Sequence, residues 1–180
     1  LDLDQVENVT FYRLREYADS IFYQNQSMDG GKVLGIDRDY LDTCGYQMIR
    51  GRGFTQKDYE KFHKVALLDE TAANSFFEKG DEIGKTLEIK GEPFTIVGII
   101  KKSDEYEPVI NSVEEYYTYY SDDSGMVLIP DTSWPIVYQY DEPQQAAVRT
   151  TAPENMSAVG KKAEEILNEG LKDWLKKAAL

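Results

Sequence analysis

The sequence predicts an α+β fold with two subdomains, one of which, made of strands plus helices, is inserted into the other. Candidate elements come in the order strands, helix–strand–helix–hairpin, a long irregular segment, strands, and a final helix. This order differs from the regular strand–helix alternation of a parallel α/β sheet. The character of the sequence changes near residues 38–53 and again near residue 125. We therefore expect residues 1–40 and 125–180 to form a discontinuous first subdomain, and residues 41–124 to form the inserted one.

The composition is that of a folded, acidic domain. The 180 residues are 41% hydrophobic, and 33 Asp and Glu against 20 Lys and Arg give a net charge of −13. This acidity argues against a nucleic-acid partner, because phosphate binding needs clustered basic residues. The longest strongly apolar run, Phe94 to Ile100, is far shorter than the roughly 20 residues that a membrane-spanning helix needs. The chain begins with Leu1 rather than Met, so we interpret it as a processed or excised piece of a longer protein.

The N-terminal region reads mainly as strands. Its β-branched and aromatic residues predict strands over Thr10–Arg15, Tyr17–Gln24 and Lys32–Ile36. A turn signal at Met28–Gly31 separates the last two strands. Residues 38–53 contain three glycines, and we expect short turns there.

A helix–strand–helix unit follows. A short helix over Thr55–Phe62 begins at a residue that can cap it, with an acidic residue three positions later. Lys64–Leu68 has an apolar centre and reads as a strand. Asp69 then caps a second helix over Glu70–Glu78, which Gly80 terminates. The apolar residues of the strand and of the second helix predict that these two elements pack face to face.

The segment from 86 to 101 is the clearest hairpin. Thr86–Lys90 alternates between apolar and polar residues, Gly91–Pro93 forms the turn, and Phe94–Lys101 returns. The return strand is apolar on both faces, which indicates a central place in its sheet.

Residues 101–125 form a long excursion that is rich in tyrosine and acidic residues. Seven Asp and Glu oppose two Lys there, and Ser112-x-x-Glu115 could start a short helix. Tyrosine offers a large contact area with few rotatable bonds and is favoured at interfaces. The candidate partner surface consists of Tyr106, Tyr116, Tyr117, Tyr119 and Tyr120. The alternative is that half of these tyrosines cover a junction between the subdomains.

The chain returns to regular structure after the excursion. Met126–Ile129 and Gln145–Thr150 read as strands that flank an irregular or briefly helical piece around Trp134. A final helix begins at about Pro153, a residue that suits the first turn. Its apolar residues recur every three or four positions and form a single stripe.

No catalytic, metal-binding or cofactor-binding residue is predicted. The segment Gly80–Thr86 is one residue short of a phosphate-binding loop and lies after a helix rather than before one. Arg50 and Arg52 could clamp an anion, but a turn whose arginines pair with nearby carboxylates is favoured. His63 is the only histidine, and it has no partner spaced for zinc and no nucleophile motif, so a structural role is favoured.

Five motifs occur in a characteristic order. They are Gly35-Ile36-Asp37-x-x-Tyr40, Gly51-Arg52-x-Phe54-Thr55-x-x-Asp58, Val65-Ala66-Leu67-Leu68 with the helix after it, Ile83-Gly84-Lys85-x-Leu87-x-Ile89-x-Gly91, and Phe94-x-Ile96-Val97-Gly98-Ile99. In this order the chain resembles the MacB-like extracytoplasmic (periplasmic core) domain of ABC transporter permeases, a group that includes FtsX-type proteins. The motif residues expected to be structural are Gly51, Arg52, Phe54, Asp58, Gly84, Lys85 and Gly98.

This resemblance implies a MacB periplasmic-core-like fold on the extracellular or periplasmic side of a cell membrane. It implies a permease that works as a dimer with a second copy and with a cytoplasmic ABC ATPase. The domain itself would be non-catalytic and would need no cofactor. It would bind cargo or a partner, such as a peptide, lipoprotein or accessory protein, and transmit ATP-driven motion for export or mechanotransmission.

Two other hypotheses stay open from the residues. The first is a free-standing secreted binding protein that uses the Tyr-rich acidic surface. The second is a small enzyme that uses His63 and a carboxylate.

Overall fold

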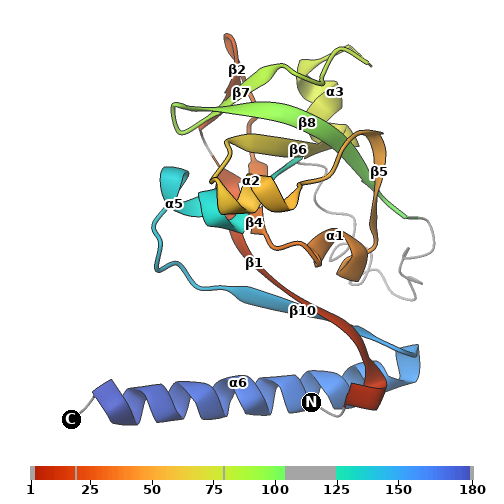
Figure 1. Cartoon of the computed structure of the whole chain (residues 1–180), viewed down its shortest axis with the longest axis vertical. Helices are drawn as coiled ribbons and strands as arrows, with labels where there is room; N and C mark the ends of the chain where they lie inside the picture. The colour runs from red at the N-terminus through yellow and green to blue at the C-terminus, as the bar shows by residue number, and fades with distance from the viewer. Residues whose placement is uncertain (1–2, 19, 79, 104–124, 179–180) are drawn as a thin grey trace.

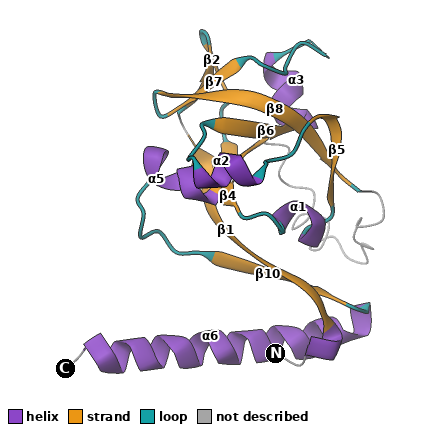
Figure 2. Cartoon of the chain, in the orientation of Figure 1, coloured by secondary structure: helices purple, strands orange, loops and turns teal. Residues whose placement is uncertain are grey.

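The computed structural model describes residues 3–18, 20–78, 80–103 and 125–178, with side chains described as far as residue 169. The described strands belong to one mixed sheet, accompanied by short helices and one long helix (Figures 1 and 2). The strands are β1 Val6–Ala18, β2 Ile21–Tyr23, β3 Gln26–Ser27, β4 Gly31–Ile36, β5 Tyr46–Gly51, β6 Val65–Asp69, β7 Thr86–Ile89, β8 Glu92–Lys102, β9 Met126–Pro130 and β10 Gln145–Thr150. The α-helices are α1 Tyr40–Thr43, α2 Gln56–Glu60, α3 Glu70–Phe76, α5 Trp134–Val137 and α6 Met156–Ala178, and the 3-10 helices are η1 Leu3–Gln5, η3 Asp131–Ser133 and η4 Pro153–Asn155.

The sheet closes into a barrel. Pairing runs from β4 through β9, β6, β8 and β7 to β2. Because β2 follows directly on β1, and β1 itself pairs with β4, this path returns to its start. β5 adds to the outer part of β8, which therefore has β5, β6 and β7 as neighbours. The predicted central place of the return strand is confirmed.

The barrel has an apolar interior to which all six strands of the closed path contribute. These inward-facing residues include Ile21, Val33, Leu68, Leu87, Ile96 and Val127. Neighbouring residues on β4, β6 and β9 point to a second cluster on the outer face, beneath α1; it includes Leu34, Leu67 and Leu128. Side chains in a strand alternate between faces, so these strands, buried on both sides, are almost wholly apolar.

Two strands extend out of the barrel as a ribbon. The first half of β1 pairs with β10, from Val6 opposite Thr150 to Tyr12 opposite Gln145. The second half of β1 pairs with β4 of the barrel, from Tyr12 opposite Ile36 onward. At the far end of this β1–β10 ribbon the chain turns into α6, which lies well apart from the barrel (Figure 1).

Most of the predicted local structure is confirmed. The strand β6, the strands β9 and β10, and the C-terminal helix lie where the sequence placed them. The hairpin of β7 and β8 is also present, but its turn is Lys90–Gly91 instead of the predicted Gly91–Pro93, because Glu92 and Pro93 already pair with Ile89 and Glu88. The packing of α3 against β6 is also present. Thr55 and Asp58 form the expected capping box at the start of α2, with both reciprocal hydrogen bonds present.

Three further predictions are wrong. Residues 38–53 contain α1 and β5 in addition to turns, because pairing with β8 holds the weakly patterned residues of β5 in a strand. The first strand was predicted to end at Arg15 and a second to begin at Tyr17. Instead β1 continues to Ala18 through a bulge in which Tyr17 has a φ of 50°. Helix α3 ends at Phe76 rather than Glu78, since Phe77 turns extended and its ring lies 4.3 Å from that of Tyr23.

The two predicted subdomains share one hydrogen-bonded sheet. β2, from the predicted first subdomain, pairs with β7 of the predicted insertion, and β6 of the insertion pairs with β9. The division at residues 40 and 125 stays a prediction. The possible helix at Ser112–Glu115 lies outside the described residues.

Candidate functional site

Most of the predicted motif residues meet at one corner of the barrel, where β5 ends and α2 begins. Asp58 is the centre of this corner, and only 2% of its surface is exposed. Its Oδ2 accepts hydrogen bonds of 2.7 Å from Arg52 Nη1, from the Thr55 backbone N–H and from Thr55 Oγ1. Burial alone would raise the pKa of Asp58, but the hydrogen bonds from Arg52, Thr55 and His63 outweigh it and hold the pKa well below its usual value.

His63 belongs to the same corner and has a structural environment. Its Nδ1 lies 3.0 Å from Asp58 Oδ1, and 41% of its side chain is exposed. The nearby Ser133 hydroxyl donates to the backbone oxygen of His63, 3.1 Å away, and not to the ring. No described hydroxyl or thiol is therefore hydrogen-bonded to the imidazole as a nucleophile would be.

The neighbouring arginine is also paired with a carboxylate. Arg50 Nη2 lies 2.6 Å from Glu82 Oε1, and the Glu82 side chain is 1% exposed. The backbone N–H of Gly80 donates to the same carboxylate at 3.0 and 3.1 Å. Burial opposes ionisation, but these hydrogen bonds and the Arg50 charge lower the pKa of Glu82. Both arginines of the predicted turn are thus already bound to acidic side chains, and an anion clamp is not available there.

Close backbone contact explains the glycines of this corner. A Cβ on Gly51 would lie 2.3 Å from the Val97 carbonyl oxygen, and the φ of Gly51 is 71°. A Cβ on Gly98 would lie 2.4 Å from the Arg52 carbonyl oxygen. β5 and β8 approach so closely here that only glycine fits. Phe54 completes the corner by packing its ring edge-on to Tyr59, with centroids 6.0 Å apart.

The remaining predicted residues lie in two other places. Gly84 has a φ of 85° in the loop that leads into β7, and apart from its two chain neighbours no residue has an atom within 4 Å of the Cβ position. Lys85 forms an ion pair of 3.2 Å with Asp81 on the surface. The five tyrosines of the predicted partner surface lie outside the described residues.

The described residues offer no evident site for a metal ion or a reactive thiolate. Nowhere in the described part of the chain do three or more His, Cys, Asp or Glu side chains gather in a way that could hold a metal. Burial raises the pKa of Cys44 to about 11, which keeps it a thiol at neutral pH. No helix in the described ranges is long and apolar enough to cross a membrane.

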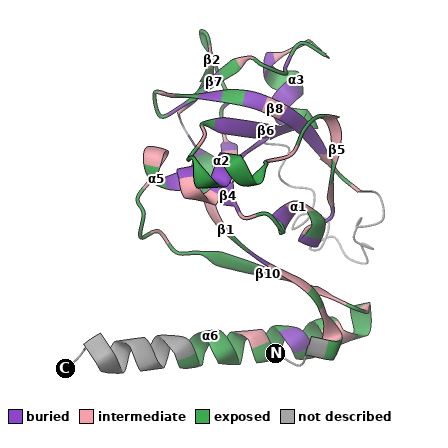
Figure 3. Cartoon of the chain, viewed as in Figure 1, coloured by how far each residue is buried: buried purple, intermediate pink, exposed green. Residues whose placement is uncertain are grey.

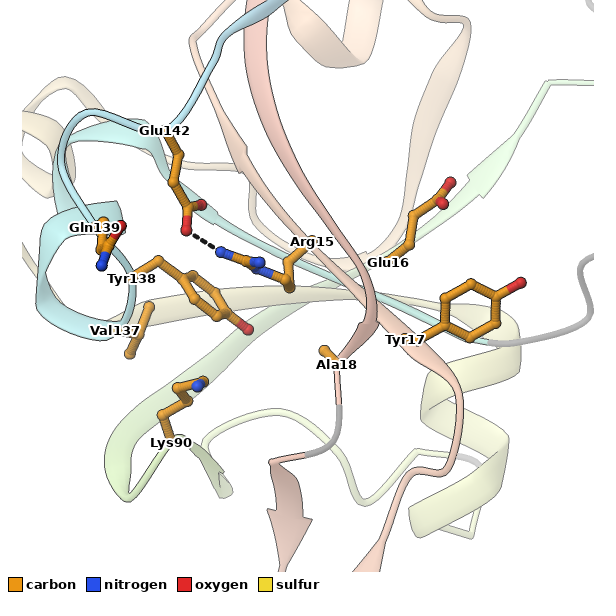
Figure 4. A pocket seen from close by; sticks show the side chains of 9 residues that line it. All are labelled: Arg15, Glu16, Tyr17, Ala18, Lys90, Val137, Tyr138, Gln139 and Glu142. Atoms are coloured by element: carbon orange, nitrogen blue, oxygen red, sulfur yellow. Dashed lines mark hydrogen bonds and ion pairs between the residues drawn. The ribbon is translucent and has the colours of Figure 1, made fainter.

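Sequence reasoning missed a cavity at the point where the ribbon leaves the barrel. It has a volume of about 590 Å³ and lies between β1, the β7–β8 turn and the segment after α5 (Figure 4). Arg15, Lys90, Tyr138 and Glu142 line it. No sequence signal marks these residues as a group, because they come from three segments that only the closed barrel brings together.

Comparison with known proteins identifies the fold and the family. The family model for the MacB-like periplasmic core domain matches residues 2–166. The ABC transporter permease YvrN of Bacillus subtilis (strain 168) is 29% identical over 168 residues, covering 93% of this chain and 39% of YvrN. The macrolide export ATP-binding/permease protein MacB of Aggregatibacter actinomycetemcomitans is 30% identical over 76 residues, covering 42% of this chain and 12% of that protein.

Two solved structures share the fold. The periplasmic region of MacB from Actinobacillus actinomycetemcomitans superposes with a TM-score of 0.66 and 19% identity, covering 93% of this chain and 69% of that one. The extracellular domain of the noncanonic ABC-type transporter YknZ from Gram-positive bacteria gives a TM-score of 0.68 and 18% identity, covering 95% and 79%.

The resemblance inferred from the five motifs is confirmed by these findings. The family match extends over both predicted subdomains and includes the β1–β10 ribbon and the first part of α6. The chain spans about two fifths of YvrN, and its aligned 76 residues span about one eighth of MacB, so it corresponds to one domain of such permeases. The chain belongs to the family of MacB-like periplasmic core domains, the extracytoplasmic domains of MacB-like ABC transporter permeases.

Proposed function

We propose that this domain is a non-catalytic mechanical part of an ABC transporter permease. It carries a binding surface for cargo or a partner and transmits ATP-driven motion between the membrane and that surface. The permease works as a dimer of two copies with a cytoplasmic ABC ATPase. The cargo or partner is a peptide, a lipoprotein or an accessory protein on the outer side of the membrane.

The β1–β10 ribbon carries this proposal. Its two strands pair over six residue positions and run together out of the barrel. Inside the barrel β1 continues into the ladder with β4, and β2 into the ladder with β7. A displacement of the outer end of the ribbon is therefore passed through hydrogen-bonded strands into the barrel, with no flexible linker between.

The joint between the ribbon and α6 is short and braced. Only Thr151 and Ala152 separate β10 from η4, which leads directly into α6. The Thr151 N–H donates to the Gln5 carbonyl oxygen at 3.2 Å, and Thr150 Oγ1 donates to the Ala152 carbonyl oxygen at 2.9 Å. The joint is thereby tied to the N-terminal segment as well, so movement of either end moves the other.

The corner around Asp58 supports a structural reading of the barrel. The described carboxylates and arginines there bind one another, and His63 has no described nucleophile beside it. The competing hypothesis is a secreted binding protein that binds through the Tyr-rich surface. That surface lies outside the described residues, so no observation favours this hypothesis.

The test uses the full-length permease with its ATPase in lipid nanodiscs. A donor on one copy and an acceptor on the other, each attached at Lys61→Cys on the exposed end of α2 in a complex without other cysteines (Cys44→Ser included), report the distance between the two barrels by energy transfer. We expect this distance to change when ATP hydrolysis is trapped with vanadate. Insertion of two glycines after Thr151 should abolish the change while ATP hydrolysis continues.

The matched control inserts two glycines between Gln24 and Asn25, in the β2–β3 turn away from the ribbon. This variant should keep the distance change. Barrels that stay fixed through the ATP cycle, or a response that survives the insertion after Thr151, would contradict the proposal.

A further inference from the structure

The cavity at the base of the ribbon brings together two cationic side chains, Arg15 and Lys90, from different parts of the chain. Arg15 comes from the end of β1, Lys90 from the turn between β7 and β8, and Tyr138 and Glu142 from the segment between α5 and β10. Figure 4 shows Arg15, Lys90, Tyr138 and Glu142 on one side of β1, whereas Glu16 and Tyr17 project on the other side. Of the two carboxylates that line the cavity, that of Glu142 therefore lies on the side of the cations and that of Glu16 does not.

Both cations contact the same aromatic ring. The guanidinium carbon of Arg15 lies 5.1 Å from the centroid of the Tyr138 ring, and Lys90 Nζ lies 5.7 Å from it. The ring is held in place because it packs, tilted by 37°, against the buried Trp134 with centroids 4.4 Å apart. Two like charges brought to one fixed ring repel each other, and an anion placed between them would relieve this repulsion.

The cations keep unused hydrogen-bonding capacity. Glu142 binds Arg15 through Nη2 alone, and no described residue accepts a hydrogen bond from the other two nitrogens of that guanidinium. Lys90 forms no ion pair with any residue in the described ranges. A guanidinium carries five N–H donors and an ammonium three, so a second carboxylate could be bound by both groups.

The backbone around the cavity is held in place. Arg13 donates through Nε to the Glu142 carbonyl oxygen at 3.3 Å and through Nη2 to the Tyr140 carbonyl oxygen at 3.4 Å. The Lys90 N–H donates to the Ser20 carbonyl oxygen at 2.8 Å. The segment that carries Glu142 is thus hydrogen-bonded to β1, and the turn that carries Lys90 is hydrogen-bonded to the residue just before β2.

Two lining residues adopt a strained conformation. Tyr17 has a φ of 50° and Lys90 a φ of 52°, a region where asparagine or glycine would be less strained. The positive φ of Lys90 belongs to the two-residue turn Lys90–Gly91 between β7 and β8, where Gly91 also has a positive φ of 79°. The hairpin turn therefore fixes the backbone from which the ammonium group reaches the cavity.

We propose that this cavity binds a carboxylate group of a ligand between Arg15 and Lys90, next to Tyr138. The ligand is an acidic peptide segment or a small organic acid, and the volume of about 590 Å³ lies within the usual range of about 300–1,000 Å³ for ligand cavities. Glu142 acts as an internal competitor for Arg15. A bound ligand would connect the barrel, through Lys90, with the base of the ribbon, through Arg15.

The proposal extends the proposed function by naming a ligand class, and its test needs neither ATP nor a membrane. The 180-residue chain is titrated by calorimetry with a blocked pentapeptide that contains two glutamates. The same peptide with two glutamines is the matched control, and succinate tests whether a free acid suffices. We expect the glutamate peptide to bind, the glutamine peptide not to bind, and affinity to fall as salt rises.

Variants locate the binding. Lys90→Asn removes the ammonium and suits the positive φ, and it should weaken binding about tenfold. Lys61→Gln changes the net charge equally but lies just after α2, and it should leave affinity unchanged. Glu142→Gln removes the competing carboxylate and should tighten binding several-fold, an effect that a purely structural role of Glu142 would not produce.

The outcomes of these titrations either support or overturn carboxylate binding at the cavity. Binding of the glutamate peptide alone supports a peptide ligand, and equal binding of succinate supports a small acid. No binding of either probe, even by the Glu142→Gln variant, would overturn the proposal. It would also be overturned if Lys90→Asn bound as tightly as the Lys61→Gln control. Loss of ATP-driven barrel motion in the transporter, with carboxylate binding intact, would count against the proposed function only.

Discussion

The barrel and the helix α6 have opposite relations to solvent (Figure 3). In the barrel, Phe94, Ile96 and Leu67 are completely buried. On α6 the apolar stripe is largely exposed, at 64% for Met156 and 59% for Leu167, and Val159 is the one residue of the described part of this helix that is buried. The barrel is therefore stabilised by its own packing, whereas α6 is held mainly through its connection to the ribbon. The barrel is therefore a rigid body, and α6 is an arm attached to it through the ribbon.

The largest expected effect is the loss of a barrel side chain. Phe94→Ala removes a ring that is fully buried in the barrel and should lower the free energy of unfolding by about 4 kcal/mol. The control Phe62→Ala removes a ring that is 59% exposed and should cost about 1 kcal/mol or less. Urea denaturation measures both, and equal losses would remove the distinction between the packed interior and the surface.

The close approach of β5 and β8 gives the next largest effect. Gly51→Ala introduces a Cβ 2.3 Å from the Val97 carbonyl oxygen at a positive φ, and should cost about 3 kcal/mol. Gly84→Val meets no neighbouring atom and should cost about 1–2 kcal/mol, from the positive φ alone. Gly53→Ala, which has neither a positive φ nor a close neighbour, should stay within about 0.5 kcal/mol. A reversed order in thermal melting would show that the strands have more room than described.

The buried carboxylate at the barrel corner gives a pH-dependent effect. The pKa of Asp58 is lower in the folded protein than its usual value of 3.8, so its ionised form stabilises the fold above about pH 4. This stabilisation is lost as the pH falls through the folded pKa. Asp58→Asn should therefore cost about 2 kcal/mol at pH 7, and the deficit should shrink steadily below pH 4. A deficit that is unchanged at pH 3 in urea denaturation would be inconsistent with this network.

The smallest effect is expected on the arm. Leu167→Ala on α6 removes a side chain that is 59% exposed, and should change the stability of the barrel by about 0.5 kcal/mol or less. Urea denaturation in a Trp174→Phe background, followed by the fluorescence of the buried Trp134, would report it. A loss of 2 kcal/mol would mean that α6 packs far more tightly than its exposure indicates.

Local patterns explain which parts of this fold were predictable. The β7–β8 hairpin and the Thr55–Asp58 capping box involve residues close in sequence, and both are present. β5 was missed because its strand conformation depends on pairing with β8, far along the chain. The early end of α3 was missed because Phe77 packs on Tyr23, a contact that no local signal announces.

The two sites also differ in how far the sequence could predict them. The sequence favoured a turn whose arginines pair with nearby carboxylates, and Arg52 does pair with Asp58, six residues along the chain. The barrel closes when β2 pairs with β7, with Ile21 opposite Ile89. Only in the closed barrel do Arg15, Lys90 and Glu142 surround one cavity. No single segment contains enough of that site to reveal it, so sequence patterns alone could not have identified it.

Hydrogen exchange of the 180-residue chain tests the contrast between rigid barrel and arm most directly. The amides of β6, β8 and β9 should exchange only through global unfolding, whereas those of α6 should exchange much faster through local opening. The amides of β10, paired with β1, should fall between the two. If the amides of α6 exchange as slowly as those of β8, the helix is part of the rigid body and the account is contradicted.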